Sequence, residues 1–395
     1  MSESVPFSLD SGSHGANSLP GLERTTYQVP KQTSDLALVV DLKDNNSYPI
    51  HFKPLSSVPD LMDRHGLQPG RVLLITDDHV GPLYAEPLLT LLSGSDWKPR
   101  VLTLPSGEST KSLAHLSDIY DVSLAWNIDR TTPVLALGGG VIGDIAGFAA
   151  STLLRGLPLV QLPTSLLAQV DSSIGGKTGI NHELGKNLVG TFYQPVFVCS
   201  DANTLTTLPD REWIGGLAEV IKHALIADSD FLTWLDEHLD LLLGRDESTV
   251  GTMITRAARI KANIVSKDER DLGLRATLNF GHTFAHALEK VSGYGHFTHG
   301  EAVFVGMKAA IALSAQNNPK LDVNRPASVF ARLPVPSIPS FLEFGQLLDA
   351  MKLDKKRASG KMRFVLLRTI GEAYVSSEIE EKDVESAWAA AVADE

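Results

Sequence analysis

Histidines and carboxylates around residue 280 have types and spacing that could bind a metal ion. Asn279, His282 and His286 follow one another at intervals of three and four residues, which would place them on one face of a helix. His299 follows at an expected loop-to-helix junction, and Glu219 stands in an earlier helical pattern. Two imidazoles and a carboxylate with an open coordination position form a catalytic zinc site. The H-E-x-x-H sequence is absent, which disfavours a zinc protease, and a helical histidine pair without metal remains the alternative.

A second polar segment, residues 159–187, contains two glycine turns and many hydrogen-bonding side chains. Its Gly-Gly-Lys-Thr run is similar to a phosphate-binding loop, but Asp171 occupies the place of that motif's first glycine. We therefore expect a pocket for a small polyhydroxylated anion, in which lysines supply charge and Asn and Asp bind hydroxyl groups. On spacing alone, a polar surface loop remains the alternative.

A glycine-rich turn, GGGVIGD at 138–144, follows the apolar run 133–137 and opens an alanine-rich helix. Glycine lets the backbone approach a pyrophosphate closely, and a helix N-terminus favours negative charge. The motif is not a strict G-x-G-x-x-G, so a dinucleotide site and a tight packing turn fit it equally well. Asp144 is accordingly either an acid favoured by the helix dipole or a cofactor contact.

The surrounding pattern predicts the elements that position these residues. Strands are expected at 37–43, 49–52, 71–76, 100–104 and 133–137, with a helix at 110–127. After residue 208 helical periodicity dominates, at 213–227, 229–243, 248–267, 277–293, 300–316, 340–352 and 381–393. The predicted fold is therefore an α/β, Rossmann-like nucleotide-binding domain followed by a mainly α-helical domain. We expect a flexible extension at 1–34, the α/β domain at 35–207 and the helical domain at 208–395.

Length and composition indicate a globular protein of two domains, with 395 residues, 43% of them hydrophobic and 21% charged. A net charge of −12 disfavours nucleic acid and anionic membranes as partners, but allows a locally basic pocket for a small anion. No apolar run is long enough for a transmembrane helix. The single Cys199 fits a reducing compartment, so we expect a cytoplasmic protein, and the N-terminal residues leave import into an organelle open.

Several blocks of the sequence, taken together, resemble the 3-dehydroquinate synthase family of sugar-phosphate cyclases. The blocks are GGGVIGDIAGFAAS (138–151), LPTSLLAQVDSSIGGKTGINHELGKNLVG (162–190), LPDREWIGGLAEVIKH (208–223) and KDERDLGLRATLNFGHTFAHALE (267–289), supported by HGEAV (299–303) and LDKK (353–356). The resemblance runs from about Val39 to Glu372 and leaves out the N-terminal extension. It implies that the α/β domain binds NAD, that the helical domain carries one divalent metal ion (zinc or cobalt), and that the protein is a homodimer.

The resemblance also implies roles for individual residues. The positions that correspond to cofactor contacts are Asp77, Asp78, His79, Glu108, Ser109, Thr110, Lys111, Gly139, Gly140, Val141, Asp144, Thr164, Ser165, Lys186, Thr204 and Thr207. Those that correspond to substrate contacts are Arg155 from the neighbouring subunit, Asp171, Lys177, Asn187, Lys222, Lys261, Arg275, Asn279 and Lys356, with Lys355 an alternative to the last. Catalytic groups correspond to Asp271, His286, Lys222 and Lys177. The metal ligands correspond to Glu219, His282 and His299, which replaces the pairing of His282 with His286 that spacing favours.

The family's substrate is an anionic sugar phosphate, 3-deoxy-D-arabino-heptulosonate 7-phosphate. The implied reaction oxidises one alcohol with NAD, eliminates phosphate, returns the hydride and closes the ring by an intramolecular aldol step. Its product, 3-dehydroquinate, belongs to the shikimate pathway of aromatic amino acid biosynthesis. The family usually has Glu at the position of Asp271, which leaves aminodehydroquinate synthase and other cyclases as alternatives. A metal- and NAD-dependent polyol dehydrogenase is a further alternative, although it would not need the cluster of lysines.

Overall fold

The computed structural model divides the chain into two units, Met1–Leu36 and Ala37–Glu395. It describes residues 37–43, 46–293, 296–335, 338, 342–357 and 362–393, all in the second unit, with only the backbone of 353–357. The expected extension at 1–34 and the side chain of Lys356 therefore lie outside the described residues. Among the described residues, no helix combines the length and the apolar character that crossing a membrane requires.

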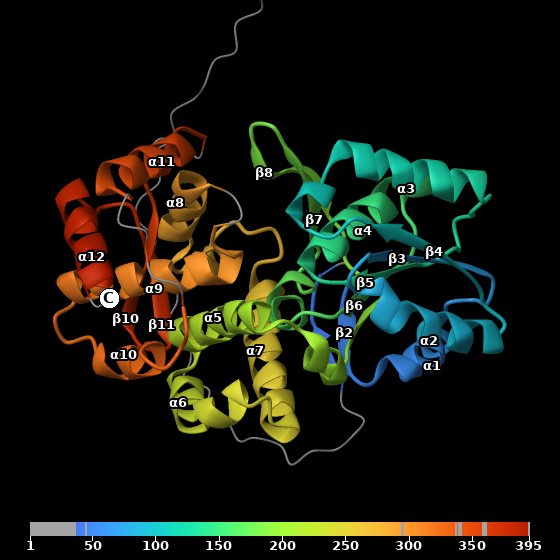
Figure 1. Ribbon diagram of the computed structural model, residues 1–395, viewed down its shortest axis with the longest axis horizontal. Helices are drawn as coiled ribbons and strands as arrows, with labels where there is room; N and C mark the ends of the chain where they lie inside the picture. Colours follow the sequence, from blue (N-terminus) through green and yellow to red (C-terminus); the bar gives the residue numbers. More distant parts are fainter. Residues whose placement is uncertain are drawn as a thin grey trace, which may run out of the picture. The chain divides into compact units, whose positions relative to one another are not determined.

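A seven-stranded sheet organises the first half of the described chain (Figure 1). In spatial order its strands are β1 (Leu38–Val40), β2 (Tyr48–Phe52), β9 (Phe197–Ser200), β6 (Leu159–Pro163), β5 (Val134–Gly138), β3 (Arg71–Asp77) and β4 (Lys98–Leu104). Neighbouring strands pair in parallel except β1 and β2, which are antiparallel. Strands β5, β6 and β9 are buried along their whole length, which explains why their sequences are almost unbroken apolar runs.

Helices cover both faces of this sheet. They are α1 (Val58–Arg64), α2 (Gly81–Gly94), α3 (Leu113–Ala125) and α4 (Gly140–Thr152). In β3, Leu73 and Ile75 belong to a hydrophobic cluster with α3 and α4, whereas Val72 and Leu74 belong to a cluster with α1 and α2. Successive side chains of a strand point to opposite faces, so the two helix pairs lie on opposite sides of the sheet, as Figure 1 shows. The prediction of a Rossmann-like α/β fold is therefore confirmed.

The strand order creates a ligand-binding edge. The chain runs from β3 outward to β4, returns past β3 to β5, and continues on the other side to β6. In doubly wound sheets, ligands bind beyond the carboxyl ends of the strands at such a reversal of strand order. The glycine turn lies at this point, because Gly138 ends β5 and Gly140 begins α4.

The rest of the chain is mainly helical, which confirms the prediction for this half. Its helices are α5 (Asp210–Ala227), α6 (Ser229–Leu243), α7 (Glu247–Lys267), α8 (His282–Ser292), α9 (His299–Asn317), α10 (Asn324–Phe330), α11 (Phe344–Arg357) and α12 (Glu381–Ala393). The bounds of α6 and α12 agree with prediction to the residue, whereas the sequence pattern does not predict α10. Two hairpins add to the fold: β7 (Lys177–His182) with β8 (Gly185–Phe192), and β10 (Phe364–Thr369) with β11 (Glu372–Ser376).

The single helix expected at 277–293 is wrong. A short 3-10 helix, Leu274–Asn279, comes first, and α8 begins only after Gly281, which has a left-handed φ of 81°. A Cβ atom at Gly281 would lie 2.8 Å from the backbone nitrogen of Met307 in α9, so the close approach of α9 requires glycine here. Asn279 therefore does not share one helix face with His282 and His286.

Candidate active site

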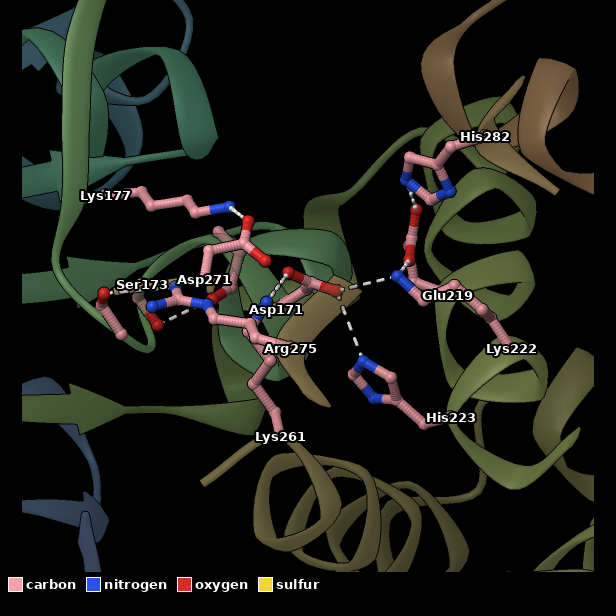
Figure 2. Close-up of polar contacts among 12 residues, drawn as sticks. Asp171, Ser173, Lys177, Glu219, Lys222, His223, Lys261, Asp271, Arg275 and His282 are labelled. Carbon is pink, nitrogen blue, oxygen red and sulfur yellow. Dashed lines mark hydrogen bonds and ion pairs between the residues drawn. The ribbon is translucent and has the colours of Figure 1, made fainter. Parts of the chain in front are cut away.

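A buried cluster of charges surrounds Asp171, which lies in the π-helical turn Ala168–Ser172 (Figure 2). Its Oδ1 accepts a hydrogen bond from Lys261 Nζ at 2.6 Å, and its Oδ2 accepts one from Lys222 Nζ at 3.1 Å. His223 Nε2 lies 3.2 Å from the same Oδ2. The side chains of Lys222, His223 and Lys261 are only 2%, 0% and 8% exposed. Helices α5 and α7 thus direct three basic side chains onto one carboxylate.

The balance of burial and charge sets the protonation of this cluster. Burial alone would raise the pKa of Asp171, but Lys222 and Lys261 hold it well below its usual range. Burial lowers the pKa of Lys261 to about 8, against the attraction of Asp171. Burial would also lower the pKa of Lys222, but Asp171 and Glu219 outweigh it and leave that pKa raised. Lys222 is therefore a permanent cation, whereas Lys261 can gain or lose a proton near pH 8.

Lys222 links this cluster to a second group, formed by Glu219, His282 and His299. Glu219 stands three residues before Lys222 on α5, and the two side chains form an ion pair (Figure 2). Oε1 of Glu219 lies 3.8 Å from Nε2 of His282 and 3.6 Å from Nε2 of His299. The potential ligand atoms of the three residues all lie within 4.8 Å of one another, so they could hold one metal ion.

This donor set fits a divalent cation. Glu219 is buried, and its Oε2 accepts no hydrogen bond from the described residues although Lys222 lies beside it as an ion-pair partner. Burial, assisted by Lys222, holds the pKa of His282 well below its usual range, so the ring is neutral and can offer a lone pair. At His299, burial would lower the pKa, but Glu289 and Glu219 raise it. The two carboxylates therefore favour positive charge at this position.

Close packing of α5 against α9 positions His299. A Cβ atom at Gly300 would lie 2.1 Å from the carbonyl oxygen of Gly215, so the two helices can approach only with glycine at this point. Glu301 completes a capping box at the start of α9. The same carboxylate accepts from Arg211 on α5 through Nε and Nη2, at 2.7 and 2.8 Å. Both contacts hold the first turn of α9, where His299 lies.

The residues predicted to contact NAD gather, with one exception, at the carboxyl edge of the sheet. Asp77 ends β3, and Asp78 and His79 follow it. Glu108 to Lys111 follow β4, Gly139 to Val141 and Asp144 follow β5, Thr164 and Ser165 follow β6, and Thr204 to Thr207 follow β9. A Cβ atom at Gly140 would lie 3.0 Å from Ser172 Oγ, which is closer than most side chains tolerate. The exception is Lys186, which lies on β8.

Lys111 joins these loops to the β7–β8 hairpin. Its Nζ donates to Asp144 at 2.7 Å and also to Oδ1 of Asn187. Burial would lower the pKa of Lys111, but Asp144 and Glu108 raise it, so the ammonium group stays charged. Asn187, predicted to bind substrate, thus contacts the predicted cofactor residue Lys111. Its φ of 56° is one that Asn tolerates better than most residues.

Lys177 and Asp271 form a more accessible pair beside the buried cluster, with Nζ and Oδ2 2.5 Å apart (Figure 2). Asp271 has a φ of 59°, a left-handed conformation in which Asp is one of the favoured residues. Arg275 is 1% exposed, and it donates to the carbonyl oxygens of Glu269 at 2.6 Å and Gly175 at 3.0 Å. Two donors of this predicted substrate residue are therefore occupied by the main chain.

Three other predicted residues, Asn279, His286 and Arg155, are exposed. The ring of His286 lies 5.5 Å from that of His282, so it belongs to the same neighbourhood as the metal group. Arg155 has a φ of 69° and follows Leu154 at 50°, a rare pair of left-handed residues without glycine.

Two residues close to these groups are absent from the sequence predictions. Glu289 lies seven residues after His282, so helical spacing was a signal that could have identified it. Its Oε1 accepts from Lys186 Nζ at 3.0 Å, and its Oε2 lies 3.5 Å from Nδ1 of His299. Burial would raise the pKa of Glu289, but His299 and Lys186 lower it to about 2. The other residue is His223, which stands four residues after Glu219 on α5, so helical spacing was a signal for it too.

Known protein families and relatives match most of this chain. Family models described as 3-dehydroquinate synthase N-terminal and 3-dehydroquinate synthase C-terminal match residues 101–215 and 216–357. A 3-dehydroquinate synthase of Salinibacter ruber is 54% identical over 362 residues, which cover 91% of this chain and 98% of that relative. A 3-dehydroquinate synthase of Nitrosomonas europaea is 48% identical over 335 residues, which cover 84% and 90% respectively.

Solved structures match the same span. The 2-epi-5-epi-valiolone synthase ValA of Streptomyces hygroscopicus, with NAD+ and Zn2+ bound, has a TM-score of 0.81 at 28% identity, over 93% of this chain and 100% of that one. An iron-containing alcohol dehydrogenase has a TM-score of 0.64 at 15% identity, over 88% and 98% respectively, and this likeness concerns the fold alone.

Proposed function

Because the chain belongs to the 3-dehydroquinate synthase family, we propose that it converts 3-deoxy-D-arabino-heptulosonate 7-phosphate into 3-dehydroquinate and phosphate. In this proposal it is a lyase of the shikimate pathway that depends on NAD and on one divalent metal ion, zinc or cobalt. Identity of 54% across 98% of the Salinibacter relative supports the same reaction in both proteins.

The observation that carries the proposal is the position of Lys222 between two groups. It donates to Asp171 in the buried cluster of charges and forms an ion pair with Glu219 of the candidate metal group. A substrate with a phosphate and a carboxylate needs cations, and a reaction that passes through an alkoxide needs positive charge at the reacting oxygen. Without substrate, Asp171 balances the positive charges of Lys222 and Lys261. The anionic groups of a bound substrate can share that role.

Each proposed ligand requires a set of residues. When bound, NAD supplies a hydride acceptor and donor, and the metal ion supplies a Lewis acid. We assign the cofactor to the loops at the carboxyl edge of the sheet, together with Lys186, and the metal ion to Glu219, His282 and His299. The fit of the donor set and the NAD+ and Zn2+ bound to ValA support this assignment.

The remaining polar residues bind substrate and move protons in this proposal. The substrate residues are Arg155, Asp171, Lys177, Asn187, Lys222, Lys261, Arg275, Asn279 and Lys356. Lys177 is 52% exposed and is held by Asp271, so an incoming anion can compete for its ammonium group. His286 is exposed next to His282, which suits transfer of a proton between substrate and solvent.

A metal- and NAD-dependent polyol dehydrogenase is the second candidate function, and the fold of the iron-containing alcohol dehydrogenase supports it. A polyol carries neither phosphate nor carboxylate, so such an enzyme has no use for two buried lysines that contact one carboxylate, one of them beside the metal group. The contacts of Lys222 and Lys261 with Asp171 therefore favour the cyclase.

An assay of two products separates the candidates. Purified full-length protein is incubated with NAD, zinc or cobalt, and the heptulosonate phosphate, while inorganic phosphate and NADH absorbance are followed together. The proposal predicts phosphate release without accumulation of NADH. Steady accumulation of NADH without phosphate would instead identify a dehydrogenase, and a higher kcat/KM with the amino analogue would identify an aminodehydroquinate synthase.

We also propose a homodimer located in the cytoplasm. The unusual backbone at Leu154 and Arg155 supports a special role for this exposed turn, and a contact with the phosphate site of a neighbouring subunit would provide one. Sedimentation of the full-length protein tests the dimer, and a monomer that retains full activity would contradict it.

A further inference from the structure

We propose that Glu289 is a positioning residue that fixes the tautomer of His299 and, through Lys186, ties the β7–β8 hairpin to the metal group. The inference rests on the proposed function, because it assumes that Glu219, His282 and His299 hold a metal ion. It adds a carboxylate outside that ligand set and a connection to a strand far away in the sequence.

The two ring nitrogens of His299 face two different carboxylates. Nε2 lies 3.6 Å from Oε1 of Glu219, and Nδ1 lies 3.5 Å from Oε2 of Glu289. A carboxylate accepts hydrogen bonds but does not donate them. With the proton on Nδ1 facing Glu289, the lone pair of Nε2 points toward Glu219 and is free for a metal ion. Carboxylates that orient metal-binding histidines in this way are a general feature of metal sites.

Burial and a second hydrogen-bond partner hold Glu289 itself in place. Its side chain is 7% exposed, and it lies on α8 two helical turns after His282. Its other oxygen, Oε1, accepts a hydrogen bond from Lys186 Nζ at 3.0 Å. Each oxygen of the carboxylate thus has its own partner, His299 on one side and Lys186 on the other. An amide in its place could accept at only one of the two positions.

Strand β8, which contains Lys186, also contacts a predicted cofactor residue. Lys186 and Asn187 are consecutive residues of β8, yet they contact different groups of the candidate active site. Lys186 pairs with Glu289 beside the metal group, whereas Asn187 accepts from Lys111, which also pairs with Asp144 at the cofactor edge. Because both contacts belong to one strand, an ordered metal group favours an ordered cofactor loop. Such coupling is reciprocal, so metal should tighten NAD binding as much as NAD tightens metal binding.

The test measures metal binding directly, without turnover. Metal-free full-length protein and its E289Q variant are titrated with Co2+ against a competing chelator, and the visible spectrum of the cobalt complex is recorded. The expected result is a loss of roughly 10- to 100-fold in cobalt affinity with E289Q and an altered cobalt spectrum. The matched control is E237Q, an exposed glutamate on α6, which should bind cobalt like the wild type.

The K186M variant tests the contact between Lys186 and Glu289, and it remains informative if E289Q does not fold. It should bind cobalt more weakly than wild type but better than E289Q, and it should reduce the factor by which cobalt tightens NAD binding. In steady-state assays both variants should lower kcat more than they raise KM for the sugar phosphate, because neither residue is proposed to bind it.

The outcomes separate this inference from the proposed function. Wild-type cobalt affinity and spectrum in E289Q would overturn the proposal that Glu289 positions His299. Unchanged coupling between cobalt and NAD in K186M would overturn the proposed connection from Glu289 through Lys186 to the β7–β8 hairpin. Retention of cobalt by H299A would instead overturn the metal group on which both proposals rest.

Discussion

Asp171→Asn should destabilise the protein strongly, and by an amount that depends on pH. The substitution keeps the shape of the side chain but removes the charge that balances Lys222 and Lys261, which are 2% and 8% exposed. Removing one partner from a buried ion pair costs about 3–5 kcal/mol. Asp171 is 17% exposed and Lys222 keeps its contact with Glu219, so we expect the lower end, about 3 kcal/mol.

The pH dependence follows from Lys261, whose pKa burial lowers to about 8. A lysine with a lowered pKa in the folded state gains stability as pH rises from that pKa toward its unfolded value of about 10.4. Asp171 raises the pKa of Lys261, so in the variant this gain begins at a lower pH. The deficit relative to wild type should therefore shrink as pH rises from 7 to about 8, and then stay constant to pH 9.

The assay is urea unfolding of both proteins at several pH values between 7 and 9, a range in which Lys222 of the wild type stays charged and His223 stays neutral. Asp240→Asn provides the matched control, because that side chain is 88% exposed and its pair with Arg332 should be worth less than about 1 kcal/mol. A deficit no larger than that of the control, or one that grows with pH, would refute the reasoning about the buried cluster.

Three further predictions concern the metal group, the substrate and the contact between α5 and α9. Glu219→Ala should lower the metal content of the purified protein, and wild-type stoichiometry would exclude Glu219 as a ligand. Asp271→Glu should change the ratio of kcat/KM between the heptulosonate phosphate and its amino analogue, whereas an unchanged ratio would make this difference from the family neutral. Gly300→Ala should weaken metal binding and cost about 1–3 kcal/mol, because its Cβ would lie 2.1 Å from the Gly215 carbonyl oxygen. Gly251→Ala, on α7 with open space around it, serves as the control and should not destabilise.

Local signals in the sequence predicted much of the fold. Helix α6 begins after Asp228, whose side chain accepts from the backbone N–H of Phe231, and its apolar residues recur at helical spacing. Strand β5 is an apolar run that ends at the glycine turn, so its place in the sheet could also be inferred. In both segments, local chemistry and tertiary packing favour the same conformation.

Predictions from the sequence were wrong or incomplete where distant residues determine the local structure. The residues near Gly281 do not predict that the helix begins there, because the close approach that requires glycine comes from Met307 on α9. Likewise, spacing along the chain favours His282 with His286 as metal ligands. The structure instead brings His282 near Glu219 and His299, and the approach of α5 to α9 that permits this was not visible in the local pattern. The roles of these residues remain predictions.

The most direct test of the central claim is whether one bound NAD supports many turnovers. The protein is loaded with metal and a single equivalent of NAD, free cofactor is removed, and excess heptulosonate phosphate is added. We predict that 3-dehydroquinate and phosphate form in equal amounts that far exceed the NAD present, with the cofactor recovered in its oxidised form. Product limited to one equivalent per NAD, with NADH left behind, would contradict it.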